Sequence, residues 1–105
     1  MRQIAAAAAF ALIILLLVAG TARASTVAGS VRDATGGLLT GVAVELRAGQ
    51  SVRSTTTDAQ GGYRFDEVAS GALQVTFFLP NFAAVHREVT VPANGHMQID
   101  VVLHL

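Results

Sequence analysis

Two histidines and two carboxylates near the end of the chain are side chains of the kinds that bind metal ions. They lie on either side of a turn signal, Pro92-Ala93-Asn94-Gly95, and would share one outward face if that turn closes a hairpin. With one amide, the set is His86, Glu88, Gln98, Asp100 and His104. Imidazole and carboxylate groups suit zinc and related metals. The alternative is a solvated polar face, and the strand register decides, because a slip of one residue moves the whole set.

A second candidate is the stretch Thr57-Asp58-Ala59-Gln60-Gly61-Gly62-Tyr63-Arg64-Phe65. Asp58, with Asp66 or Glu67 nearby, could contribute oxygens to calcium, but calcium needs six to eight of them and the acidic spacing is sparse. The simpler interpretation is structural. Asp58 bonds its own backbone in a tight turn, and Gly61 takes a positive φ there.

The aromatic residues divide into a structural pair and a candidate contact surface. Tyr63 and Phe65 alternate onto one face, and we expect Tyr63 to bury its ring and donate its hydroxyl to backbone at a sandwich corner. Phe78 is out of phase with Leu73, Val75, Phe77 and Leu79, so it points away from their core. With Phe82 it predicts an exposed patch for a partner. The alternative is that Phe78 packs beneath a loop or a neighbouring strand.

Nucleophilic catalysis is not indicated, because the serines occur in strand or turn contexts without the elbow that activates a nucleophile. The main interpretation therefore assigns no catalytic residue, metal ion or cofactor. A small exported metal-dependent protein or enzyme that uses the late histidine and carboxylate face is the alternative.

The N-terminal segment predicts export. A basic start (Met1-Arg2) precedes an apolar run, Ile4–Gly20, and Ala22-Arg23-Ala24 forms a cleavage signal. We expect a signal peptide over residues 1–24 and a mature domain over 25–105; an uncleaved membrane anchor is the alternative. The chain has no cysteine, which excludes disulfides and the lipoprotein route. Secretion, or a periplasmic location in a Gram-negative bacterium, follows from this interpretation.

The net charge of the expected mature domain excludes two kinds of partner. This domain has five arginines and seven acidic residues, which gives a net charge of −2 (5 − 7 = −2), and the arginines are scattered singly. No basic stripe is available for a nucleic acid. No polybasic patch is available for an anionic membrane once the signal peptide is removed.

The elements that position all of these residues are β-strands. Apolar residues alternate with polar ones throughout residues 25–105, and turn signals such as Asp33-Ala34-Thr35-Gly36-Gly37 interrupt them about every 8–12 residues. This pattern predicts about seven short strands in antiparallel sheets with one face solvated. Gly29, inside the first strand, indicates a bulge or a close backbone approach. We expect one small all-β sandwich.

Three segments of this chain resemble the carboxypeptidase regulatory-like domain, a transthyretin-like (prealbumin-like) β-sandwich. They are Gly29-x-Val31-x-Asp33-x-x-Gly36-Gly37-x-Leu39-x-Gly41-Val42-x-Val44-x-Leu46, Thr57-Asp58-x-x-Gly61-x-Tyr63-x-Phe65, and Ile99-x-Val101-x-Leu103, with Gly71 and Phe82 between the last two. Leu38, Leu73 and Asn81 depart from the usual pattern.

The resemblance implies a Greek-key sandwich that serves as an accessory or adhesive module without catalytic residues. The residues of this chain exclude two activities that proteins of similar fold have. A Lys–Asn isopeptide crosslink is impossible because the chain has no lysine, and Asp100–Leu105 lacks the Tyr-Arg-Gly-Ser ending of hydroxyisourate hydrolases. We therefore expect a non-enzymatic module that contacts a protein or a glycan at the cell envelope. The absence of Trp and the single Tyr weaken the glycan interpretation.

Overall fold

The computed structural model describes residues 24–105, and every regular element in that range is a strand. The predicted signal peptide lies outside these residues except for Ala24, where the first strand begins. The strands are β1 (Ala24–Asp33), β2 (Ala43–Ala48), β3 (Ser51–Thr56), β4 (Gly62–Ala69), β5 (Gly71–Phe78), β6 (Val85–Val91), β7 (His96–Gln98) and β8 (Val101–Leu103). Residues 24–105 contain no helix that is long and apolar enough to cross a membrane.

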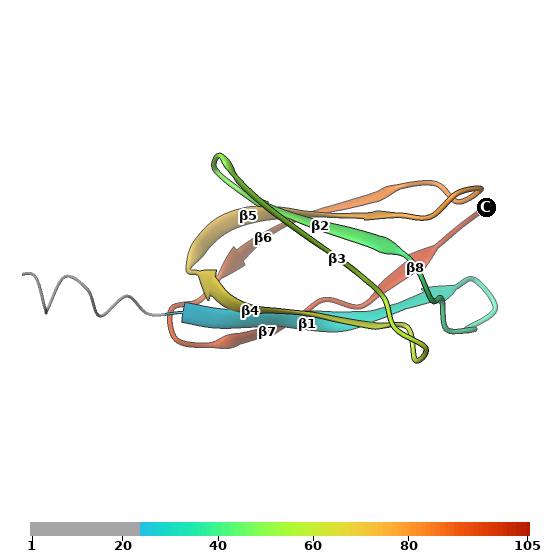
Figure 1. Ribbon diagram of the computed structural model, residues 1–105, viewed down its shortest axis with the longest axis horizontal. Coiled ribbons are helices and arrows are strands. Elements are labelled where there is room, and N and C mark those ends of the chain that lie inside the picture. The colour runs from blue at the N-terminus through green and yellow to red at the C-terminus, as the bar shows by residue number, and fades with distance from the viewer. Residues whose placement is uncertain (1–23) are drawn as a thin grey trace, which may run out of the picture.

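The strands form two sheets that face each other (Figure 1). One sheet has the order β4-β1-β7, with β8 also paired to β1, and the other has the order β3-β2-β5-β6. We call the first the β1 sheet and the second the β2 sheet. The chain changes sheet after β1, β3, β4 and β6. This confirms the predicted all-β sandwich.

Two features of the β1 sheet differ from the prediction. β7 and β8 both run parallel to β1, whereas antiparallel pairing was expected. The structure also has eight strands where about seven were expected, and its C-terminal segment contributes two of them, β7 and β8. The division between these two falls at Asp100, whose Oδ1 accepts the amide of Ser30 at 2.9 Å in the place of a backbone acceptor.

The core lies between the sheets and follows the predicted alternation. Val44, Val75 and Phe77 of the β2 sheet are fully buried, as are Val27 and Val31 of β1. Burying one such side chain stabilises the fold by roughly 1.5–3 kcal/mol. A core of valines and a few rings therefore holds the sandwich together without disulfides.

The sequence Asp-Ala-x-Gly-Gly occurs twice and builds the same turn twice. Oδ1 of Asp33 accepts the amides of Thr35 and Gly37, each at 2.9 Å. Oδ1 of Asp58 likewise accepts the amides two and four residues later, each at 2.9 Å. At Asp33, the hydrogen bond from the Thr35 hydroxyl has the largest effect, and together with the amide bonds it lowers the pKa of the carboxyl.

Candidate functional site

The turn at Asp58 has the backbone hydrogen bonds that the sequence predicts for its carboxylate. Besides its two amide bonds, Asp58 exchanges backbone hydrogen bonds with Gly62 and Gly61, each 3.0 Å long. Gly61 has φ of 72°, and a Cβ there would lie 2.9 Å from the carbonyl oxygen of Val31. Asp66, one of the possible calcium ligands, is paired with Arg64 at 2.7 Å. The Asp58 carboxylate thus satisfies its own turn.

Tyr63 closes a corner of the sandwich, also as predicted. Its hydroxyl donates to the backbone carbonyl of Ile99 at 2.6 Å, and its ring packs edge-on against Phe77, with 5.4 Å between centroids. Burial, and to a smaller extent the Asp100 carboxylate, raise the pKa of this phenol well above its ordinary value. Only a glycine fits at position 29 beside this corner, because a Cβ there would lie 1.9 Å from the carbonyl oxygen of Ile99 that accepts the Tyr63 hydroxyl. Phe65 is buried beside Tyr63.

The candidate metal face, which was the alternative interpretation, does not form. β6 pairs with β5 in the β2 sheet, whereas β7 and β8 pair with β1, so the segment Pro92–Gly95 crosses between sheets and closes no hairpin. His86 and Glu88 consequently lie in one sheet, and Asp100 and His104 belong to the other side of the sandwich. Within residues 24–105 no group of three or more His, Cys, Asp or Glu side chains could hold a metal ion.

The separated residues have other contacts. Nδ1 of His86 lies 3.0 Å from the hydroxyl of Thr76 on β5. Asp100 accepts from the amide and hydroxyl of Ser30 and from the Gln98 amide group. The backbone carbonyl of His104 accepts the amide of Ala83 at 2.7 Å. These contacts tie the strands and loops of the sandwich together.

Phe78 points away from the core, as its phase in the sequence predicts. Its side chain is 51% exposed, while the preceding Phe77 is fully buried. It lies opposite Ala43 of β2, whose small side chain leaves the ring uncovered. Along β5 the same outer face carries Thr76 and Gln74. Phe78 is thus an isolated aromatic ring at one end of a polar sheet face.

Phe82 does not share that exposure. It is partly buried and packs against the core. It also lines a hollow at the end of the sandwich, with Asp33, Leu103 and His104 among its neighbours. The predicted patch therefore consists of Phe78 on the outer face, while Phe82 contributes to the core.

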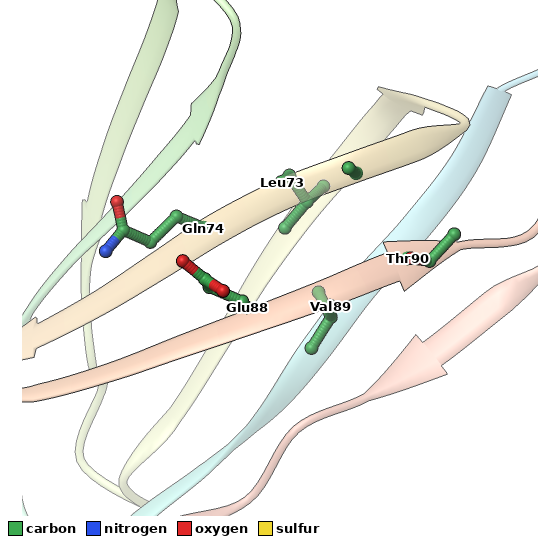
Figure 2. Close-up of a pocket in the computed structure, with 6 residues that line it drawn as sticks. Leu73, Gln74, Glu88, Val89 and Thr90 are labelled. Atoms are coloured by element: carbon green, nitrogen blue, oxygen red, sulfur yellow. The ribbon is translucent and has the colours of Figure 1, made fainter.

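The opposite end of the same face is hollowed. A shallow depression of about 480 Å³ is lined by residues 72–74 of β5 and 88–90 of β6. Gln74 and Glu88, which are partners in the strand register, present their polar ends next to each other (Figure 2). The outer face of the β2 sheet thus has an aromatic ring at one end and an amide–carboxylate pair at the other.

Sequence reasoning missed one structural arrangement, which involves Arg53. The pairing of β1 with β4 contains a β-bulge, because Ser25 pairs with Val68 whereas Val27 pairs with Phe65. Glu67 lies in this bulge and takes φ of 54°. Nη1 of Arg53 donates to the carbonyl of Asp66 at 2.6 Å, close to the bulge. No glycine or proline marks this bulge, so no local signal could have predicted it.

Solved structures from several bacteria share this fold. The Bacillus anthracis TIE protein aligns with a TM-score of 0.70 and 10% identity, over 78% of this chain and 16% of that chain. A "putative carbohydrate binding protein" from Bacteroides uniformis aligns with a TM-score of 0.60 and 22% identity, over 77% and 41%. The 5-hydroxyisourate hydrolase of Klebsiella pneumoniae aligns with a TM-score of 0.61 and 19% identity, over 76% and 84%.

At these identities the likeness concerns the fold alone. This chain also spans well under two thirds of the first two proteins. A search of the curated proteins found no match. The family comparison is more informative, because residues 26–104 match the carboxypeptidase regulatory-like domain from β1 to the end of β8. The chain therefore belongs to the carboxypeptidase regulatory-like domain family.

Proposed function

We propose that this chain is an exported, non-enzymatic β-sandwich module that contacts a glycan or a protein at the cell envelope through the outer face of the β2 sheet. The observation that carries the proposal is the exposure of Phe78, at 51%, on a strand whose other large apolar side chains are buried. Exposing an aromatic ring beside small and polar neighbours suits contact with a partner.

The surroundings of Phe78 favour a glycan as the first ligand to test. The outer face carries the ion pair of Arg47 with Glu45 at 3.1 Å, and the Thr76–His86 pair. Sugars bind where an aromatic ring stacks on their C–H groups and fixed polar side chains meet their hydroxyls. The name of the Bacteroides uniformis relative agrees with this ligand class.

Export is the second element of the proposal. It rests on the predicted signal peptide over residues 1–24, which leaves the sandwich of residues 25–105 as the mature domain. The periplasm or the cell exterior of a Gram-negative bacterium is the proposed location.

Affinity capture from the native envelope fraction tests the proposal, with the full chain as the cell produces it. The Phe78→Ser variant removes the ring, and Val102→Ser is the matched control because Val102 is 43% exposed on the other sheet. We expect a captured partner to be lost in Phe78→Ser and retained in Val102→Ser. Equal recovery of every partner by all three proteins would contradict the proposal.

Treating the envelope fraction before capture separates the two ligand classes. A glycan resists protease and is destroyed by periodate, whereas a protein partner shows the opposite behaviour. Capture that survives protease treatment and is lost after periodate treatment identifies the glycan.

A further inference from the structure

The two edge strands of the β2 sheet carry arginines at the two ends of one row. Arg53 of β3 lies opposite Leu46, Leu46 lies opposite Val75, and Val75 lies opposite Arg87 of β6. Residues that lie opposite each other point to the same face of a sheet. Because Leu46 and Val75 are buried, both arginines project from the core side of the sheet, one at each open side of the sandwich.

Arg53 is satisfied at its end of the row. Its guanidinium donates to the carbonyls of Asp66 and Glu67, at 2.6 and 3.4 Å, and lies 5.5 Å from the centre of the Phe65 ring. All three partners belong to β4 of the opposite sheet. On this side, therefore, backbone oxygens of a neighbouring strand accept the hydrogen bonds of an inward-facing arginine.

Arg87 has no such neighbour at the other end. β6 is hydrogen-bonded to β5 alone, so its outer edge is unpaired within residues 24–105. The two ion pairs that form in this range are Arg47–Glu45 and Arg64–Asp66, and Arg87 belongs to neither. The adjacent Glu88 points to the opposite face, since side chains alternate along a strand.

The side chains next to Arg87 on the core side are apolar. Val85 and Val89 flank it two residues away, and both pack on the core while keeping part of their surface exposed. An unpaired backbone edge, two half-covered valines and a central cation together define a strip that an extended chain could cover.

We propose that β6 binds an extended segment of another protein, which adds antiparallel to the β2 sheet with a carboxylate opposite Arg87 and apolar residues opposite Val85 and Val89. Backbone hydrogen bonds supply affinity in this mode, and the alternating side chains supply specificity. The carboxylate takes the part at Arg87 that the β4 carbonyls take at Arg53. This site is separate from the outer face around Phe78.

A second copy of this chain fits the edge poorly. Symmetric pairing over the whole of β6 is centred on Glu88 and places it opposite its own copy. Moving the two-fold axis one residue along β6, a slide of two residues between the strands, places Arg87 opposite Arg87. Like charges directly opposite each other destabilise a strand pair, so the charge pattern of β6 favours a different chain that places a carboxylate opposite Arg87.

The test uses the ¹⁵N-labelled full chain and the peptide Thr-Val-Lys-Asp-Thr-Val-Thr, with its Asp→Asn form as the control. In the antiparallel register its Asp faces Arg87, its valines face Val85 and Val89, and its Lys faces Glu88. We expect amide shifts centred on β6 and binding roughly two- to fivefold tighter for the Asp peptide, because the carboxylate adds an exposed ion pair. Arg87→Gln removes this preference, and Arg64→Gln, an exposed arginine on β4, retains it.

Three results would overturn the proposal. They are equal binding of the two peptides, no binding of either up to about 5 mM, and shifts confined to strands other than β6. Concentration-dependent dimerisation with protected β6 amides in the free protein would assign the edge to a second copy instead. None of these results bears on the outer face, so this proposal and the proposed function fail separately.

Discussion

The guanidinium of Arg53 donates a hydrogen bond to the backbone carbonyl of Asp66, with 2.6 Å between Nη1 and the oxygen. The bond joins the edge of the β2 sheet to the bulged strand β4 of the β1 sheet. One arginine thus closes one side of the sandwich, and the equivalent side at Arg87 remains open.

Replacing Arg53 by methionine keeps an apolar stem over Phe65 and removes the bonds to β4. We expect a loss of about 1 kcal/mol in the free energy of unfolding, since hydrogen bonds from charged groups are stronger than neutral ones and this one is exposed. Urea denaturation measures the loss. Arg64→Met, which removes only the surface ion pair with Asp66, should cost about 0.5 kcal/mol or less; equal losses would contradict the role of Arg53.

Gly29→Ala should damage the sandwich at its corner. The added Cβ would lie 1.9 Å from the Ile99 carbonyl oxygen, which is backbone and cannot move away without breaking the Tyr63 bond. We expect a destabilisation of about 3 kcal/mol or more. The matched control is Gly62→Ala, whose Cβ would meet nothing closer than 3.5 Å. A thermal melt of Gly29→Ala that coincides with the control would refute the close contact.

Tyr63 makes stability depend on alkaline pH. Because its folded-state pKa is raised above the ordinary value of 10.0, the phenol ionises more readily in the unfolded chain. Stability is therefore complete below about pH 10 and falls above it, by up to about 1.4 kcal/mol per pH unit. This is the chain's single tyrosine, and the chain has no lysine to titrate in the same range.

The Tyr63→Phe variant is the control for this effect. It should lose about 1 kcal/mol at neutral pH through the missing bond to Ile99. Its stability should then change little between about pH 9 and 11. A wild-type protein whose tyrosine ionises near its ordinary pKa while still folded would contradict the buried corner.

Asp33 gives the opposite dependence, at acid pH. Its folded-state pKa is lowered by the hydroxyl of Thr35 and the amide of Gly37, so it stabilises the fold above its ordinary pKa of 3.8. That contribution is lost as the pH falls through the lowered value. An NMR titration should place the pKa of Asp33 below 3.8. In denaturation series, Asp33→Asn should lose less stability on acidification than the wild type; identical slopes would contradict the prediction.

The sequence was sufficient for features that depend on nearby residues. The alternation around Phe77 and Phe78 predicted which ring is buried, and the turn at Asp58 and the close approach at Gly29 each had a local signal. The pairing of strands that lie far apart in the chain could not be predicted from the sequence. The histidine and carboxylate face was wrong because Pro92–Gly95 resembles a hairpin signal but crosses between sheets. The row from Arg53 to Arg87 depends on three registers that no short segment encodes.

The central claim is that the outer face of the β2 sheet around Phe78 is the contact surface. Amide chemical-shift mapping of the ¹⁵N-labelled full chain against soluble fragments of the native envelope tests it most directly. We predict shifts at Ala43, Thr76 and Phe78, which fade in the Phe78→Ser variant. Shifts confined to the β1 sheet, around Val102, or a Phe78→Ser variant with an unchanged response, would contradict the claim.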